Sequence, residues 1–464
     1  MAKEKIKPIV FPNGTAFLPG VSAAVVFSNS TTIFEKPDAE PIEVMPKYGK
    51  VVPWGESNDL PQQILSKASK SPDLSTGLLF NIKVAYGDGI IACRYEIDKD
   101  GKKKVVPVYD NVEINEFFEH NDINGYLLEQ LTDLDFFYNI FPEIILNQES
   151  PASRKVVELN SKEATFSRWE EMNEKTGKIE HHFYSSKWAD GTPDEKDIDV
   201  TNVLDMKRPI PDILRKIGRD KRLDGKTKDD KIFRYVVPVS FPTPGRSYYQ
   251  KPYWYSIIES GWYDFATFIP DFKKYLIQNG MTLRHIIYLA DDYFDRIFAE
   301  EGITDKAKQK DRVKTEYNNI NKFLTGIENT GKSVVSFYKP GIGVDSGKKT
   351  YRFEIQTVKN EFKGGEYLED SGEVSNMIAY TLGVHPSLIG ATPGKNAGSF
   401  SGTDKRELFI IKQALLKPVR DRILRPLYLI KAVNKWPEDI HFAIPNIELT
   451  TLDKNKTGIE TKIS

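Results

Sequence analysis

The 464-residue chain lacks the features that mark membrane, secreted and disulfide-stabilised proteins. It has one cysteine, so no disulfide can form within the chain, and we interpret Cys93 as a small buried apolar residue. No run of about 18 apolar residues occurs, and the first residues contain no long apolar core. These absences predict a protein of a reducing compartment that makes no contact with a membrane.

An excess of charge of either sign is also absent. Lys and Arg number 65 against 66 Asp and Glu, which gives a net charge of −1. A protein that grips nucleic acid over its whole surface is strongly basic, because neutralising phosphates supplies most non-specific affinity. Any contact of this chain with DNA is therefore confined to a small part of its surface, or is too weak to hold the DNA in place.

Motifs for metal binding and catalysis are missing as well. None of the six histidines stands in an HExxH pattern or beside paired cysteines, so a zinc site has no support. No Ser/His/Asp, Cys/His or paired-carboxylate arrangement stands out. We therefore predict no catalytic residues, no metal and no cofactor, and a protein that is not an enzyme.

The first half of the chain predicts a mixed α+β domain. Residues 1–50 are rich in Pro, Ser and Thr and read as an irregular arm. Helical periodicity over 54–90 and within 114–147 is followed by short alternating and β-branched stretches. Residues 51–250 are therefore expected to form one α+β domain.

Two long helices with apolar stripes are predicted in the second half. The first covers 251–280, kinked at Pro270, and the second closes the segment 359–384. Residues 281–358 lie between them as a small module of strands and a polar helix. The stripes fit contacts between subunits or a core within one chain, and their residues are Ile257, Phe265, Phe268, Phe272 and Leu276, then Val374 and Ile378.

A Gly/Ser/Pro loop over 385–403 precedes a long helix over 404–434 and a tail over 435–464. The loop is either an ordinary connector or a segment that contacts DNA, for which it offers Lys395, Asn396, Ser399 and Phe400. The helix, with Asp404 as its predicted cap, carries about five net positive charges. This predicts a solvated face, or one that meets DNA or an acidic partner subunit through Lys405, Arg406 and Lys412.

The stretch GIENTGKSVVSF (326–337) fits the phosphate-binding pattern G-x-x-x-x-G-K-[ST] over Gly326–Ser333. That loop normally leaves a buried strand and opens into a helix, whose N-terminus then faces the phosphates. Here a helical pattern comes before the motif and a strand pattern follows it. The stretch IIYLADD (286–292), in which apolar residues are followed by two acidic ones, favours nucleotide binding. The order of elements disfavours it, so a P-loop ATPase stays an alternative.

The order of helix, small module, helix, Gly/Ser loop and long helix resembles the portal protein of long-tailed, siphovirus-type bacteriophages. The resemblance covers roughly residues 54–430 and is most specific over 374–430, which begins VSNMIAYTLGVHPSLIGATPGKNAGSFSGTDKRELFIIKQ. Local matches are GESNDLPQQIL, NIKVAYGDGI, ENTGKSVVSF and the long stretch that begins at Pro252. His385 is an addition to the family's usual Gly-Val-Pro turn.

The resemblance implies a dodecameric ring at one capsid vertex, through which double-stranded DNA is packaged and ejected. It would make 51–250 the wing, the two striped helices the stem, 281–358 the clip, and 385–403 a tunnel loop facing DNA. The implied partners are the terminase large subunit, the major capsid protein, the scaffold and a head–tail adaptor. The implied location is the virion, with assembly in the host cytoplasm.

A monomeric nucleic-acid-binding protein is the third alternative. Its best support is YYQKPYWY (248–255), an aromatic and basic stretch suited to base stacking. The same residues also fit the start of the first long helix.

Overall fold

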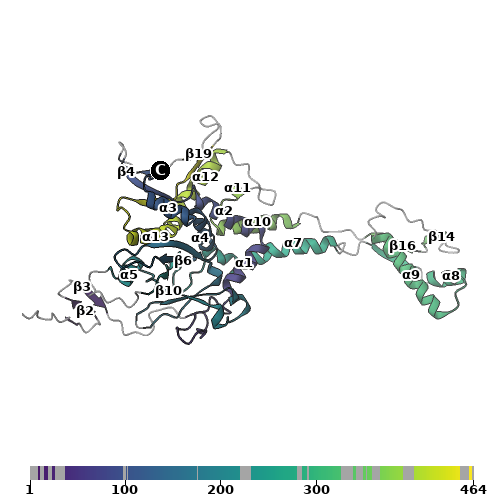
Figure 1. Cartoon of the computed structure of the whole chain (residues 1–464). Coiled ribbons are helices and arrows are strands. Elements are labelled where there is room, and N and C mark those ends of the chain that lie inside the picture. The colour runs from purple at the N-terminus through teal and green to yellow at the C-terminus, as the bar shows by residue number, and fades with distance from the viewer. Residues whose placement is uncertain are drawn as a thin grey trace, which may run out of the picture. The chain divides into compact units, whose positions relative to one another are not determined.

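The computed structural model describes residues 9–10, 15–18, 23–26, 37–97, 101, 103–174, 176–219, 231–278, 285–289, 292–325, 338–340, 349–351, 353–357, 366–389, 402–449 and 459–461. The chain divides into two compact units, which we describe separately. The first combines residues 1–263 with 374–464, and the second covers 264–373 (Figure 1). The fold is mixed α+β, which confirms the predicted class.

A seven-stranded sheet organises the first unit. The strand order is β12-β6-β11-β10-β9-β8, with β7 pairing β6, and only β10 and β11 run parallel. Helix α5 (Pro209–Lys216) connects that parallel pair, as a crossover between parallel strands requires. The strands are β6 (Asn139–Leu146), β7 (Val156–Lys162), β8 (Ser167–Trp169), β9 (His181–Tyr184), β10 (Asp199–Val203), β11 (Arg234–Val236) and β12 (Val239–Ser240).

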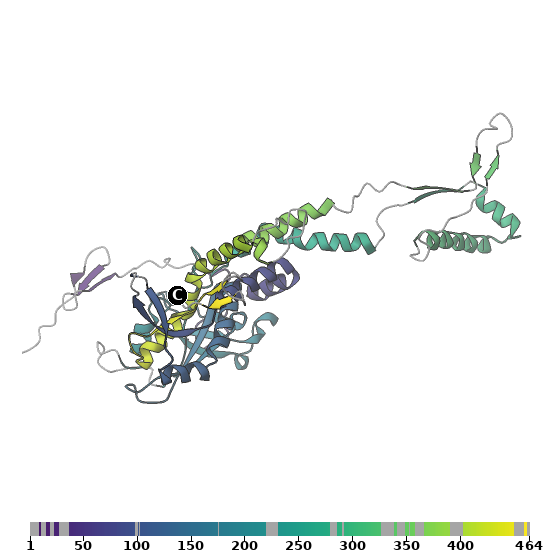
Figure 2. The same ribbon diagram turned by 90° about the horizontal axis from the view of Figure 1, so that it is seen from above.

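Helices from both ends of the chain pack around one core. Figures 1 and 2 show α13, in yellow, among the blue N-terminal elements. Ile423, Leu427 and Val433 of α13 are fully buried in one cluster with Leu127 and Ile144. The helices are α1 (Leu60–Lys70), α2 (Pro72–Tyr86), α3 (Val112–His120), α4 (Ile123–Phe137) and α13 (Lys417–Asn434).

Smaller sheets complete the first unit. β17 (His441–Ala443) pairs with β4 (Ile91–Ile97), which pairs with β5 (Lys103–Pro107), and this sheet buries Cys93 as predicted. The arm predicted to be irregular instead holds a three-stranded sheet of β1 (Ile9–Val10), β2 (Thr15–Leu18) and β3 (Ala23–Val26). β18 (Ile447–Leu449) pairs with β19 (Ile459–Thr461) in the predicted tail.

Two of the long helices predicted in the second half, 251–280 and 404–434, are interrupted. The first breaks at Gly261, whose φ of +83° ends α6 (Ser256–Glu259) after the short turn η4 (Tyr253–Tyr255), and α7 (Trp262–Gln278) then runs through Pro270. The C-terminal helix breaks at Leu416 into α12 (Gly402–Leu415) and α13. Pro418 starts α13, where a missing N–H costs nothing. Because α12 begins at Gly402, Asp404 lies in its first turn and is not the cap.

The second unit contains short antiparallel strand pairs and charged helices. β13 (His285–Leu289) pairs with β16 (Phe353–Thr357), and β14 (Tyr338–Pro340) with β15 (Lys349–Tyr351). Helix α9 (Lys306–Thr325) matches the predicted polar helix, whereas α8 (Tyr293–Glu300) was not predicted. Arg312 of α9 binds the carboxylates of Glu301 and Glu316 at 2.8 and 2.7 Å.

A buried arginine joins the start of α1 to the sheet. Arg168 of β8 is fully buried between the rings of Trp54 and Trp188, 5.7 and 5.5 Å from their centroids. Its guanidinium donates to the carbonyls of Asn58 and Thr165 at 2.7 and 3.1 Å. These bonds offset the cost of burying the charge, although burial still lowers its pKa to about 10.

We expect Arg168→Met to lower the free energy of unfolding by on the order of 3 kcal/mol, because buried carbonyls lose their donors. Urea denaturation measures the change. Arg94→Met is the control: Arg94 pairs with Asp439 at the surface, where solvent screens the pair, and should contribute far less. Equal losses in the two variants would contradict the role given to Arg168.

Candidate functional site

The turn that follows α10 (Glu366–Thr381) is the described structure closest to the predicted DNA-facing loop. Its backbone turns at Gly383, whose φ is +61°, and helix α11 (Pro386–Ile389) follows. Leu382 anchors the turn against α2, where a Cβ added to Gly77 would lie 2.3 Å from the leucine's Cδ1. A side chain at Gly77 would therefore force the Leu382 side chain to shift.

Two side chains cap the carbonyls at this turn. The Lys412 ammonium donates to the Gly383 carbonyl at 2.9 Å, and the Asn81 amide donates to the Leu382 carbonyl at 3.2 Å. Carbonyls at a helix C-terminus have no partner within the helix, and cations there also interact favourably with the helix dipole. Lys412 of α12 and Asn81 of α2 thus hold the end of α10 in place.

A buried carboxyl lies close to this cap. Burial raises the pKa of Asp135, near the end of α4, to about 7, and the nearby Lys412 and Asn81 partly offset the effect. Burial likewise lowers the pKa of Lys412, with Asp135 opposing the shift. We call Asn81, Asp135 and Lys412 the turn cluster. It joins α2, α4 and α12.

The structure corrects the prediction that Lys412 faces DNA, because its side chain is buried and serves the cap. Three other cations of α12 and α13 also bind carbonyls: Arg420 those of Val84 and Ala85, Arg425 that of Met206, and Lys431 that of Glu438. Lys417 pairs with Asp421 at 2.8 Å. Within the described ranges, Lys405, Arg406 and Arg422 make no ion pair or side-chain hydrogen bond.

The predicted stem residues divide into buried and exposed groups. Ile257, Val374 and Ile378 are buried in the chain, with 3%, 3% and 1% exposed, so their assignment to a subunit interface is wrong. The core of one chain already covers them. On α7, Phe265, Phe268 and Phe272 are 60%, 66% and 39% exposed. The side chain of Leu276 lies outside the described residues, as do Lys395, Asn396, Ser399 and Phe400 of the loop.

Further exposed apolar residues accompany this group. Tyr275 continues the α7 face at 62% exposure, three residues after Phe272. Tyr380 of α10 is 80% exposed, and the others are Ile410, Ile411 and Leu415 of α12. Helical periodicity alone could not distinguish these exposed apolar positions from the buried ones, because both groups lie in helices with apolar residues three and four apart.

The aromatic stretch proposed for base stacking is mostly buried. Tyr248 and Tyr249 are 6% and 7% exposed, and their hydroxyls accept the backbone N–H groups of Met172 and Trp169. Trp254 is also buried and donates to the carbonyl of Asp135 at 2.9 Å. This overturns the stacking role of residues 248–255.

The nucleotide-like motif at 326–333 lies outside the described residues. The strand part of IIYLADD, in β13, pairs antiparallel with β16, unlike the parallel sheet of a phosphate-binding fold. In the part of the chain that the structure describes, no group of three His, Cys, Asp or Glu could hold a metal ion. None of the described helices is long and apolar enough to cross a membrane.

Comparison of folds finds likeness to chains of a virus-like particle. A chain in the virion of a native gene transfer agent particle has a TM-score of 0.50 and 11% identity, covering 85% of this chain and 85% of that chain. A chain in the neck of a native gene transfer agent particle, computed with C12 symmetry, has a TM-score of 0.51 and 13% identity over 85% of both chains. At these identities the likeness concerns the fold alone. No family model and no curated protein matches the sequence.

Replacing Lys412 with Met should lower the free energy of unfolding by about 1–3 kcal/mol, because the Gly383 carbonyl loses its charged hydrogen-bond donor. Lys405→Met, on the exposed start of the same helix, should have no measurable effect. Chemical denaturation of both variants tests this. Equal free energies of unfolding for the two variants would contradict the capping role of Lys412.

Asp135 should make stability depend on pH. Its pKa is raised from 3.8 to about 7 on folding, so the folded state retains a proton that the unfolded state has lost. Its contribution to stability is full below about pH 4 and is lost as pH rises through about 7. The free energy of unfolding of Asp135→Asn should therefore rise relative to that of the wild type, by at most about 1.4 kcal/mol per pH unit within this window. Denaturation at several pH values measures the difference, with exposed Asp110→Asn as the control.

Proposed function

We propose that this chain is a portal-type subunit of a phage or phage-like particle, which assembles into a ring around a channel for double-stranded DNA. The observation that carries the proposal is the fold likeness over 85% of both chains to a chain in a neck computed with C12 symmetry. A rotationally symmetric neck requires subunits with heterologous side contacts that close into a ring. The proposed ring is a dodecamer.

The exposed face of α7 supports such contacts. Phe265, Phe268, Phe272 and Tyr275 present a row of aromatic side chains on one helix, with 39–66% of each exposed. Exposed apolar patches of this kind mark interaction sites, because covering a Phe side chain contributes roughly 1.5–3 kcal/mol. In the proposed ring this face lies against a neighbouring subunit and forms part of the stem.

The remaining segments have the roles that a portal-type subunit would give them. Residues 51–250 act as the wing and 281–358 as the clip, where the terminase large subunit and later a head–tail adaptor dock. The major capsid protein and scaffold surround the ring during assembly in the host cytoplasm. The loop over 385–403 faces DNA, and the near-zero net charge of the chain suits transport, since a strongly basic lining would hold DNA. The chain itself catalyses no reaction.

Class-averaged electron images of the purified chain test the proposal, together with native mass measurement. We expect a holed annulus with a mass near twelve times that of the 52.9 kDa chain. Phe268→Glu should raise the concentration needed for assembly at least about tenfold, because it places a charge in the subunit contact.

The matched control is Tyr109→Glu, which alters an aromatic residue that is 76% exposed in a loop of the first unit. It should leave both the annulus and the melting temperature unchanged. Compact single copies in the wild-type images would refute the ring. Rings that tolerate Phe268→Glu would instead remove α7 from the interface.

A further inference from the structure

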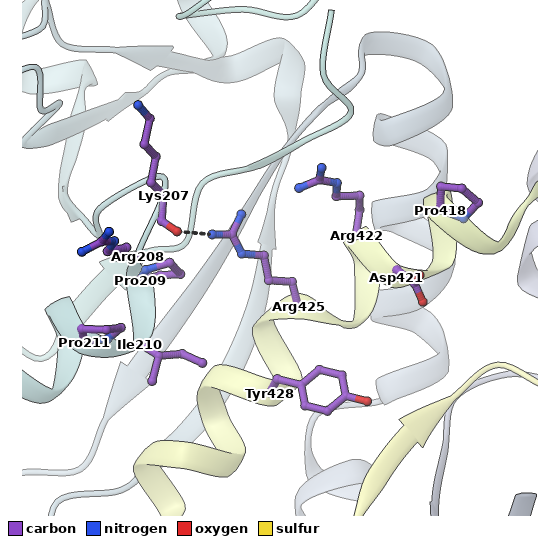
Figure 3. A pocket seen from close by; sticks show the side chains of 10 residues that line it. All are labelled: Lys207, Arg208, Pro209, Ile210, Pro211, Pro418, Asp421, Arg422, Arg425 and Tyr428. Atoms are coloured by element: carbon purple, nitrogen blue, oxygen red, sulfur yellow. Dashed lines mark hydrogen bonds between the residues drawn. The ribbon is translucent and has the colours of Figure 1, made fainter. Parts of the chain in front are cut away.

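A groove in the first unit gathers four cations, of which the side chain of only Arg425 binds another described residue. It lies between the start of α5 and α13 and encloses about 600 Å³ (Figure 3). Lys207, Arg208, Arg422 and Arg425 supply its positive charge, and Asp421 is its single acidic lining residue. The carboxylate of Asp421 already binds Lys417 at 2.8 Å, so it does not neutralise the groove.

The four cations differ in whether their side chains bind other residues of the chain. Arg425 is tied to the groove wall by its bond to the Met206 carbonyl at 2.9 Å. The side chains of Lys207, Arg208 and Arg422 make no ion pair or hydrogen bond with any residue that the structure describes. Burial lowers the pKa of Arg425, and repulsion by the charge of nearby Arg422 lowers that pKa further. An anion between them would relieve this repulsion.

The walls of the groove are apolar and rigid. Pro209 and Pro211 open α5, Pro418 opens α13, and Ile210 and Tyr428 complete the surface, as Figure 3 shows. Prolines in the first helical turn fix the backbone, so the groove exists before any ligand arrives. A preformed apolar concavity with a few converging charges is typical of a ligand site.

We propose that this groove binds an acidic peptide segment of a partner protein, with carboxylates on Arg422 and Arg425 and an apolar side chain against Ile210 and Tyr428. The planar guanidinium forks match carboxylates in pairs of hydrogen bonds. A DNA duplex fits less well, because its affinity comes from many phosphates along an open surface and it would leave the apolar walls uncovered. The groove lies within one chain, so the inference does not depend on ring formation.

Fluorescence anisotropy with the full-length chain and labelled synthetic peptides tests the proposal. The probe is the hexapeptide Asp-Glu-Leu-Asp-Glu-Phe, and the control replaces its acids with amides, as Asn-Gln-Leu-Asn-Gln-Phe. We expect saturable binding of the acidic peptide alone, weakened by salt. Arg422→Gln should weaken binding roughly fivefold to tenfold, since a charge-assisted pair is lost.

Arg406→Gln is the matched control, because it removes from α12 a cation that binds none of the described residues. It should bind the peptide as the wild type does, and both variants should keep the melting temperature, since neither side chain supports the described fold. Equal binding of the acidic and amide peptides, equal losses in the two variants, or no binding would each overturn the proposal. So would stronger competition by a 12-base-pair duplex than by unlabelled peptide, which would make the groove a phosphate surface.

Discussion

The capping of the turn at Leu382 and Gly383 is the constraint on which the organisation of the first unit depends. The last carbonyls of a helix have no partner within it, and a buried one such as that of Leu382 must find a donor elsewhere in the chain. Asn81 and Lys412 supply those donors from elements far apart in the sequence. The cap therefore requires α2, α10 and α12 to meet, and it places the starting point of the following loop on a rigid base.

The same principle explains why the basic C-terminal region is less basic at its surface than its composition indicates. Arg420 reaches the end of α2 and satisfies the carbonyls of Val84 and Ala85. Lys431 does the same for residues after α13. Arg420 thus holds the C-terminal helix against the N-terminal core and Lys431 orders the segment after it, so much of the positive charge serves the fold. The cations that remain available lie at the start of α12 and in the α5–α13 groove.

Apolar residues divide in a comparable way. Val374 and Ile378 of α10 are covered by the first unit, and Ser375 beside them donates to the carboxylate of Asp73 on α2 at 2.7 Å. The aromatic row on α7 keeps much of its surface exposed. Residues of α10 thus contribute to stability within a chain, whereas α7 carries the surface that we propose for association. In a portal-type ring the two tasks are complementary, because a subunit must be folded before it can present a contact to its neighbour.

The sequence by itself determined the α+β class, the helix pair around 54–90, the buried Cys93 and the polar helix α9, because these follow from local periodicity and capping. Charge counts and spacing could not assign Lys412, Arg420 or Ile378, since a cap or a core contact depends on which distant element lies opposite. The break at Gly261 was also missed, because the residue sat in register with an apolar stripe while its backbone adopts a positive φ. Only the tertiary structure decided which cations and which apolar side chains remained at the surface, because burial is a property of the packed chain and not of its pattern.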